Sequence, residues 1–294
     1  MTTAEFALVD ELADSIDVAR PTGRLRRESW VEGGFATSAL RWGADRSEVV
    51  FLHGGSMNAH AWDSLLLQTP FNALALDLPG HGDTDWFEEP VYVPEDLAQA
   101  VAPAMQALAP SARTVVGHSL GGLTALALAA QRPDLVGRLV LVDSSPAARR
   151  DDSEALRAMV SRSDFSSFEE LLTHVLDPAR GDSRPLRRKL LLNARELPDG
   201  RWSWRHDARE STKGDKWEAV FTAVPRGWEH AAAVRCPTLL LRGERSTVLS
   251  EEDVERYVEL VPDLRVEVLP GVGHHLQGER PLALGALIAE FAAH

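Results

Sequence analysis

Short hydrophobic runs alternate along the chain with longer stretches of helical spacing, and the later runs are nearly continuous in apolar residues. Eight runs predict strands, at residues 29–34, 37–43, 48–54, 72–80, 113–119, 138–145, 238–244 and 265–271. Four stretches predict helices, at residues 94–109, 120–133, 250–262 and 281–293. Strands that are apolar throughout are typical of a parallel sheet buried on both faces. The alternation therefore predicts an α/β fold, with a doubly wound, mostly parallel eight-stranded sheet and right-handed crossovers.

This alternation stops between Pro146 and Ala233. The stretch is polar and poor in strand patterns, and it contains helical pieces. We predict two domains: a core domain of residues 1–145 plus 234–294, and a helical cap inserted at residues 146–233 over the ligand-binding edge of the sheet. Four of the eight tryptophans lie in the insertion: Trp202, Trp204, Trp217 and Trp228. They either line an apolar pocket or form the core of the cap itself.

The composition is that of an ordinary globular protein. Of 294 residues, 44% are hydrophobic and 26% are charged, which is enough material for a large core. The formal net charge is −13, and the chain has no basic block. Binding to a phosphate backbone needs a basic face, so we expect no nucleic-acid partner.

Cysteine usage and the N-terminal sequence restrict the setting further. The single cysteine, Cys236, cannot form an internal disulfide, and we expect it to be a small buried hydrophobic residue. No Cys/His cluster has the spacing of a zinc site. The N-terminal segment is acidic and lacks the pattern of a secretory signal, and no apolar run approaches the roughly 20 residues of a membrane span. We therefore expect a cytoplasmic protein with no membrane partner.

Candidate chemistry lies where the fifth predicted strand meets a helix. Residues 117–121 read Gly-His-Ser-Leu-Gly and match the pattern G-x-S-x-G in its expected context. A strained turn there exposes a serine hydroxyl at a helix N-terminus, where the dipole and free N–H groups favour developing negative charge. Glycines at positions 117 and 121 avoid clashes with the neighbouring strand and helix. Ser119 is therefore the predicted nucleophile.

A serine hydroxyl needs a base, and two adjacent histidines near the C-terminus compete for that role. We assign it to His274, because the preceding Gly-Val-Gly loop can turn its ring toward Ser119. His275 is expected to pack beside the pocket or to face solvent.

The negative charge that develops on the attacked oxygen needs preformed donors. One is the backbone N–H of Leu120, the residue after the nucleophile. The other is assigned to Gly55 in the segment FLHGGSMN, because glycines let the backbone approach a substrate closely; Ser56 is the alternative. His53 in the same segment is expected to stabilise the loop rather than act as a base.

Together these motifs resemble the α/β-hydrolase superfamily. HGG follows the third predicted strand, DLPGHGDTD the fourth, GHSLGG the fifth, and GVGH with ERP the eighth. The resemblance covers nearly the whole chain. It implies the α/β-hydrolase fold, a helical cap after the sixth strand, and a triad in the order serine, acid, histidine. Asp77 and Asp83 resemble a structural loop of the family, and we assign them no chemistry.

One position departs from the family pattern. After the seventh strand the family usually carries G-x-x-D, whose aspartate is the triad acid, but residues 243–246 read Gly-Glu-Arg-Ser. A serine cannot supply the negative charge that stabilises an imidazolium. Either the protein is an inactive relative or the acid has moved. The resemblance permits a shift to the end of the sixth strand, where Asp143 lies; its other reading is a cap at the start of the insertion. Glu244, Glu251 and Asp253 remain alternatives.

These residues predict a serine-dependent hydrolase that cleaves a carboxylic ester or lactone through an acyl-enzyme, with no metal or organic cofactor. The substrate is expected to be a small molecule, apolar or aromatic. One alternative is a hydrolase of carbon–carbon bonds of the meta-cleavage type, which a pocket arginine contacting a carboxylate would favour; the insertion offers Arg149, Arg150, Arg187 and Arg188. Another alternative is a non-catalytic receptor. Dehalogenases and epoxide hydrolases of this fold use an aspartate where this chain has Ser119, so both are disfavoured. The sequence leaves the oligomeric state open.

Overall fold

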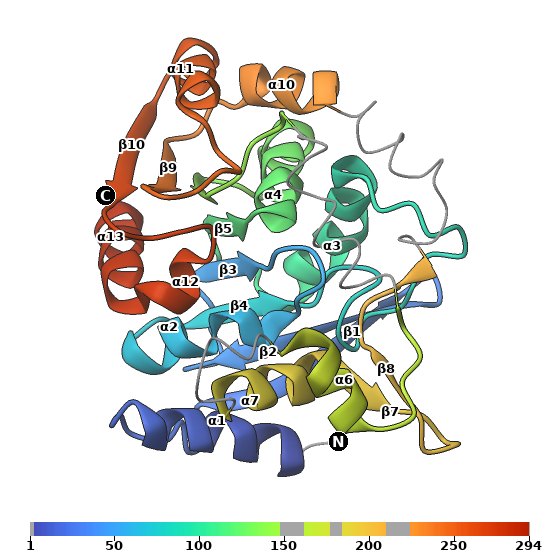
Figure 1. Cartoon of the computed structure of the whole chain (residues 1–294). Coiled ribbons are helices and arrows are strands. Elements are labelled where there is room, and N and C mark those ends of the chain that lie inside the picture. The colour runs from blue at the N-terminus through green and yellow to red at the C-terminus, as the bar shows by residue number, and fades with distance from the viewer. Residues whose placement is uncertain (1–2, 148–161, 177–183, 210–223, 294) are drawn as a thin grey trace.

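An eight-stranded sheet forms the centre of the molecule in the computed structural model, which describes residues 3–147, 162–176, 184–209 and 224–293. Its strands are β1 (Leu25–Glu32), β2 (Phe35–Trp42), β3 (Val49–Leu52), β4 (Ala73–Leu76), β5 (Thr114–His118), β6 (Arg138–Val142), β9 (Thr238–Gly243) and β10 (Leu264–Leu269). They are ordered β1-β2-β4-β3-β5-β6-β9-β10 (Figure 1). β2 pairs antiparallel with β1 and β4, and all other neighbours pair parallel. The predicted sheet is confirmed.

Helices cover both faces of this sheet (Figure 1). The four predicted helices are α3 (Pro94–Leu108), α4 (Leu120–Gln131), α11 (Glu251–Leu260) and α13 (Pro281–Ala293). Four further elements were not predicted: α1 (Thr3–Ser15), the 3-10 helix η1 (Ala59–Trp62), α2 (Asp63–Gln68) and α12 (Leu276–Glu279). Helices α3, α4 and α11 pack on one face, and α1, α2, α12 and α13 pack on the other.

The two faces of the sheet are buried in two separate hydrophobic clusters. In β6, Leu139 and Leu141 belong to the cluster beneath α3 and α4, whereas Val140 and Val142 belong to the cluster beneath α2 and α13. All four side chains are fully buried. Successive side chains of a strand point to opposite faces, so a strand covered on both sides is apolar throughout. This explains the continuous hydrophobic runs in the sequence.

The chain between β6 and β9 interrupts the alternation, as predicted. Its described parts hold α6 (Phe168–Val175), α7 (Arg184–Asn193), β7 (Ala194–Glu196), β8 (Trp202–Trp204) and α10 (Val224–Ala233). The β7–β8 hairpin was not predicted, because each strand has only three residues. Its turn did carry a signal, Pro-Asp-Gly at residues 198–200, with Gly200 at a φ of 80°.

The described tryptophans of the insertion lie in hydrophobic cores. Trp204 is buried and Trp202 is half-buried in a cluster with Phe165, Phe168 and apolar residues of α6 and α7. These two side chains therefore support the second of the two alternatives, a core within the insertion. Trp217 lies outside the described residues.

The last helix of the insertion packs elsewhere. Trp228 of α10 belongs to the main core, and its ring centroid lies 5.1 Å from that of Tyr257 in α11. The division into core and cap domains stays a prediction. The packing of α10 favours ending the cap before Val224.

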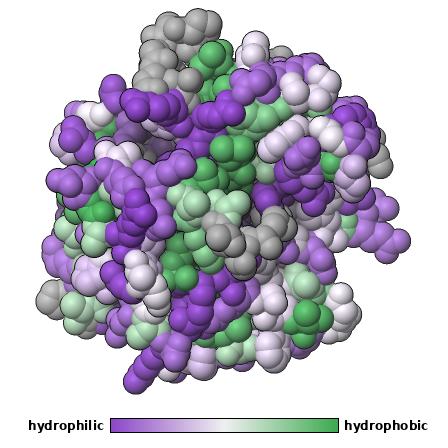
Figure 2. All heavy atoms as spheres, turned by 90° about the horizontal axis from the view of Figure 1, so that it is seen from below, coloured by the Kyte–Doolittle hydropathy of each residue, from purple (hydrophilic) through white to green (hydrophobic). Residues whose placement is uncertain are grey.

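Helices α1 and α7 lie on the lower side of the molecule in Figure 1. A cleft between them is lined in part by Ala4, Leu8, Leu191 and Leu192. Seen from below, hydrophobic side chains gather toward the middle of this face, with hydrophilic side chains around them (Figure 2). None of the helices in the described ranges combines the length and apolarity needed to cross a membrane.

Candidate active site

Ser119 stands at the sharp turn between β5 and α4. Its backbone has a φ of 53° and a ψ of −118°, a conformation that a residue with a side chain adopts only where its surroundings enforce it. A Cβ on Gly117 would lie 2.2 Å from the carbonyl oxygen of Gly121, and one on Gly121 would lie 2.3 Å from that of Leu52. Both glycines of the motif are thus required by close backbone contacts. Ser119 is half-buried, and its side chain does not cap α4.

Asp143 directly follows β6 and is fully buried. Its Oδ1 accepts a hydrogen bond from the N–H of Gly243 at 3.0 Å. Its Oδ2 accepts one from the hydroxyl of Ser246 and lies 2.7 Å from Nδ1 of His274. A buried carboxylate needs such partners, because leaving it unpaired costs several kcal/mol, roughly. Ser246, at the usual aspartate position of the family, therefore supports the carboxylate that contacts His274.

The three alternative acids make other contacts. Glu244 accepts a hydrogen bond from the N–H of Gly271 at 2.7 Å, and Glu251 lies 3.8 Å from Arg242. Asp253 forms a capping box with Ser250 at the N-terminus of α11. The geometry therefore favours Asp143 as the partner of His274.

His274 keeps one ring nitrogen available. Its Nδ1 faces Asp143, its side chain is 25% exposed, and its Nε2 has no hydrogen-bond partner within the described part of the chain. A proton held on Nδ1 by a carboxylate leaves the Nε2 lone pair free to accept another. His275 is exposed, and its ring centroid lies 5.3 Å from that of His274.

His118, the residue before Ser119, ties the His274 loop to the serine turn. Its Nε2–H donates to the carbonyl oxygen of His274 at 2.9 Å, and the two ring centroids are 4.6 Å apart. Burial holds the pKa of His118 well below its ordinary value, so the ring is neutral and its Nδ1 accepts from the Gln277 amide at 3.3 Å. Neither His118 nor Gln277 was predicted as a site residue, because the pattern G-x-S-x-G leaves position 118 open and the motifs GVGH and ERP do not include position 277.

Ser119 is also joined to the end of β6, which carries Asp143. The Ser119 N–H donates to the carbonyl oxygen of Val142 at 3.1 Å. The Ser144 hydroxyl donates to the carbonyl oxygen of Ser119 at 2.8 Å. The structure thereby brings Ser119, Asp143 and His274 into one cluster at the carboxyl ends of β5 and β6.

The two predicted oxyanion donors belong to neighbouring residues. A Cβ on Gly55 would lie 3.8 Å from Cδ2 of Leu120, the residue that carries the other predicted donor. The carbonyl oxygen of Gly54 accepts hydrogen bonds from Nδ1 of His53 at 2.8 Å and from the N–H of Met57 at 3.2 Å. A trans peptide group is planar, so its N–H points away from its C=O. These bonds therefore fix the direction of the Gly55 N–H.

The alternative donor, Ser56, is already engaged. Its N–H donates to Nε2 of His81 at 3.1 Å, which favours Gly55. His53 acts in the loop as expected, since its Nε2 accepts from the N–H of Leu78 at 2.9 Å. Burial lowers the pKa of His53 to about 3, so the ring stays neutral and both nitrogens stay in these bonds.

A second histidine–aspartate pair lies where η1 meets α2. His60 Nδ1 is 2.8 Å from Oδ2 of Asp63, and His60 Nε2 is 2.8 Å from Oε1 of Glu5 in α1. Burial favours the neutral ring, but the two carboxylates outweigh it and raise the pKa of His60 to about 9. This imidazole is therefore charged at neutral pH, and neither nitrogen can accept a proton.

Two of the four arginines named above, Arg187 and Arg188, lie within the described residues. Arg187 pairs with Glu169 at 2.6 Å and lies over the ring of Phe168. Burial lowers the pKa of Arg188, and the charges of Asp63 and Glu11 act in the opposite direction. Arg149 and Arg150 lie outside the described residues. The described ranges contain no group of three or more His, Cys, Asp or Glu side chains suited to a metal ion.

Cys236 is half-buried and packs against the main core. Burial raises the pKa of its thiol, which keeps it protonated and unreactive. Its contacts agree with the expected role as a small hydrophobic residue.

The chain is similar to a known protein family and to characterised enzymes. A family model described as alpha/beta hydrolase fold matches residues 49–281. The chain is 39% identical over 289 residues to the esterase Rv0045c of Mycobacterium tuberculosis, covering 95% of this chain and 93% of that protein.

Two further similarities extend this result. A crystal structure of the same M. tuberculosis esterase superimposes with a TM-score of 0.84 at 36% identity, over 100% of this chain and 99% of that one. An sn-1-specific diacylglycerol lipase, ABHD11 of Mus musculus, is 29% identical over 261 residues, covering 83% of this chain and 80% of the lipase.

Proposed function

The chain belongs to the α/β-hydrolase family, and we propose that it cleaves small carboxylic esters or lactones through an acyl-enzyme on Ser119. One observation carries the proposal: His274 holds its Nδ1 on the buried Asp143, keeps its Nε2 unpaired among the described residues, and has its loop bonded to His118, the residue before the strained, half-buried Ser119. This is the arrangement that an activated serine nucleophile requires. The similarity to an esterase and to a lipase supports esters as the substrate class.

The mechanism follows from the positions of these groups. Ser119 Oγ attacks the ester carbonyl carbon while Nε2 of His274 takes its proton, and Asp143 stabilises the imidazolium. The backbone N–H groups of Leu120 and Gly55 stabilise the oxyanion. His274 then protonates the leaving alcohol and afterwards activates the water that releases the acid.

The finer substrate features remain predictions. An apolar or aromatic acyl or alcohol part is still proposed, but Trp202, Trp204 and Trp228 pack in cores and give it no support. The cytoplasmic location also stays a prediction. A non-catalytic receptor was suggested by the serine at position 246, and this argument weakens because Ser246 donates to the carboxylate beside His274.

The test is hydrolysis of a short and a medium-chain p-nitrophenyl ester, together with labelling by a fluorophosphonate that needs no knowledge of the substrate. We expect Ser119→Ala to lose at least about 10⁴-fold in kcat and to lose the label. The matched control is Ser145→Ala, a neighbouring serine whose hydroxyl accepts from the N–H of Ala147.

The outcomes separate the alternatives. Full activity in Ser119→Ala would refute the proposal. Labelling of Ser119 without ester hydrolysis would point to the carbon–carbon hydrolase. Absence of both in the wild-type protein would support the receptor.

A further inference from the structure

His81 belongs to the loop that follows β4, and its ring contacts the segment that carries the proposed oxyanion donor. Its Nδ1–H donates to the carbonyl oxygen of Pro79 at 3.0 Å, so its Nε2 carries the lone pair that accepts from the Ser56 N–H. The side chain is 4% exposed, and burial lowers its pKa. The ring is therefore neutral, and its acceptor is permanently available to Ser56.

The hydrogen bond from the Ser56 N–H to His81 restrains the backbone on the C-terminal side of Gly55. Ser56 has a φ of 58°, which is unfavourable for a residue with a side chain. The peptide group between Gly55 and Ser56 is held by His81, and the one between Gly54 and Gly55 is held by His53. Glycine has the greatest backbone freedom of all residues, so Gly55 keeps one conformation only because both of its peptide groups are held from outside.

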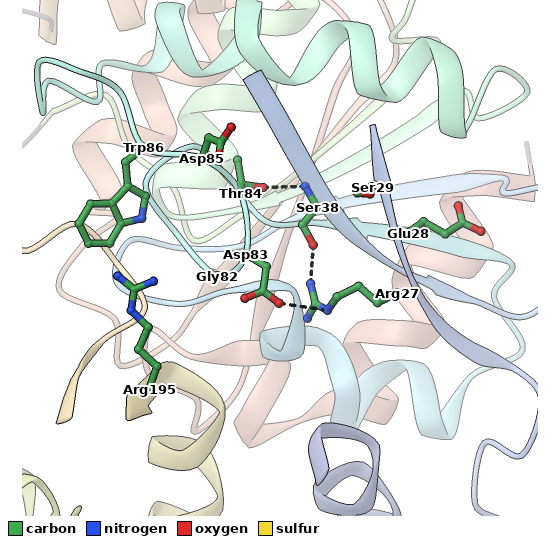
Figure 3. Close-up of a pocket in the computed structure, with 10 residues that line it drawn as sticks. All are labelled: Arg27, Glu28, Ser29, Ser38, Gly82, Asp83, Thr84, Asp85, Trp86 and Arg195. Atoms are coloured by element: carbon green, nitrogen blue, oxygen red, sulfur yellow. Dashed lines mark hydrogen bonds and ion pairs between the residues drawn. The ribbon is translucent and has the colours of Figure 1, made fainter. Parts of the chain in front are cut away.

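The loop that carries His81 is itself fixed to the sheet (Figure 3). The Thr84 hydroxyl accepts from the N–H of Ser38 at 2.8 Å, and Arg27 lies 3.4 Å from Asp83. Gly82 has a φ of 58°, and a Cβ on it would lie 2.3 Å from the carboxyl carbon of Asp77. His81 is therefore presented by a rigid loop rather than by a mobile one.

The insertion holds the same loop from the opposite side. The N–H of Asp207 donates to the carbonyl oxygen of Gly80 at 2.7 Å, and Arg205 pairs with Asp83 at 2.7 Å. The Tyr92 hydroxyl donates to Asp207 at 2.7 Å. The segment after β8 thus contacts the loop that carries His81, and this loop in turn contacts Ser56, the residue after Gly55.

We propose that His81 is a positioning residue, which fixes Gly55 in the geometry that directs its N–H toward the oxyanion. The inference rests on the proposed function. It assigns to the PGHG motif at residues 79–82 a role in transition-state stabilisation, exerted through Ser56.

The test compares two substitutions at this position. His81→Phe keeps an aromatic ring beside His53 and Tyr92 but removes the acceptor, whereas His81→Gln keeps an acceptor for Ser56 and a donor for Pro79. Each is assayed for kcat and KM with p-nitrophenyl butyrate and for inhibition by an alkyl trifluoromethyl ketone. Ser119 Oγ adds to the ketone carbon, its proton passes to His274, and the ketone oxygen becomes an oxyanion, so inhibitor affinity reports the oxyanion site.

We expect His81→Phe to lower kcat by about 10- to 100-fold, somewhat less than direct loss of an oxyanion donor, with KM nearly unchanged. Affinity for the ketone falls by the same factor, and His81→Gln restores most of both. Tyr92→Phe is the matched control. It removes the hydrogen bond to Asp207, the residue that holds the same loop through Gly80, but leaves the acceptor of His81 in place. It should lower thermal stability without changing either readout.

Two results would overturn the inference. The first is activity and ketone affinity of His81→Phe within about twofold of wild type, because this difference is too small for a lost oxyanion contact. The second is an equal loss of both in Tyr92→Phe, which would indicate a general loosening of the loop. Failure of the proposed function looks different. In that case the wild-type protein itself is not labelled at Ser119 and does not bind the ketone.

Discussion

Two buried aspartates in this molecule each hold a histidine, at almost the same distance. His274 lies 2.7 Å from Asp143, and His60 lies 2.8 Å from Asp63. The difference is on the far side of each ring. His60 presents its second nitrogen to Glu5 and is 4% exposed, whereas His274 keeps its second nitrogen unpaired within the described residues and is 25% exposed.

A histidine–carboxylate contact by itself therefore carries no chemistry. A second carboxylate keeps the ring of His60 charged at neutral pH, and this cation ties α1 to η1 and α2. An accessible second nitrogen leaves the ring of His274 able to take a proton and give it back. The histidine–aspartate pair thus links helices at one site, whereas at the other site its histidine is a candidate base.

Replacing each histidine with glutamine tests most directly whether His274 and His60 differ in function. His274→Gln should lower kcat by about 10⁶-fold, as loss of the base does in serine hydrolases. His60→Gln should keep kcat within about threefold, because it lies outside the proposed machinery. Steady-state ester hydrolysis measures both, and comparable losses of kcat in the two variants would contradict the distinction.

The acids give the next largest effect. Asp143→Asn should lower kcat by about 10⁴-fold through loss of the correct imidazole tautomer and of charge stabilisation. Its counterpart, Asp63→Asn, should leave kcat nearly unchanged. Near-normal kcat in Asp143→Asn, with folding confirmed by circular dichroism, would move the acid to another residue.

Stability should show the reverse order. His60→Gln leaves Glu5 and Asp63 without a cation between them, and we expect the free energy of unfolding to fall by about 3 kcal/mol. His274→Gln removes a partly exposed ring and should cost less than about 1 kcal/mol. Urea denaturation of wild type and of the two variants measures these losses, and a midpoint of His60→Gln equal to that of wild type would show that the His60 cluster adds no net stability.

The His60 cluster also predicts a pH dependence of stability. Its pKa is raised from 6.5 to about 9 in the fold, so its contribution is complete below pH 6.5 and is lost as the pH rises through about 9. Burial opposes ionisation of Glu5, but hydrogen bonds from His60 and Arg27 lower its pKa from 4.5 to about 2. The contribution of Glu5 is therefore lost as the pH falls from about 4.5 to 2.

Thermal unfolding across pH 6 to 9.5 tests the alkaline half of this prediction. The melting temperature of wild type should fall more steeply over this range than that of His60→Gln, because the variant has no proton to lose there. Parallel curves for the two proteins would rule out a charged His60.

The smallest effect is expected at Ser246. Ser246→Ala removes one of the hydrogen bonds to Asp143 but leaves those to Gly243 and His274. One lost hydrogen bond to a buried charge corresponds to about a 5- to 10-fold loss in kcat. A loss as large as that of Asp143→Asn would mean that Ser246 itself takes part in the chemistry.

Local patterns in the sequence predicted most of the fold and part of the site. The apolar runs located all eight strands of the main sheet, and the signal was clearest for central strands such as β3, β4 and β6, because a strand covered on both faces has no polar side to display. Ser119 and its glycines were recognised because the constraints on a strand-to-helix turn lie within five residues. The β7–β8 hairpin and α1 were missed, since strands of three residues and a helix of mixed polarity give weak periodic signals.

The amino-acid sequence by itself determined which backbone segments form and where a serine can be exposed, because those properties depend on neighbours a few residues apart. Only the tertiary structure decided which carboxylate meets His274, since Asp143 is 131 positions away and reaches it through the pairing of β6 with β9. It also decided that Ser246 and Gly243 support this carboxylate, that His118 holds the His274 loop, and that Ser56 is engaged by His81. Contacts of this kind depend on the order of strands in the sheet, which no local pattern records.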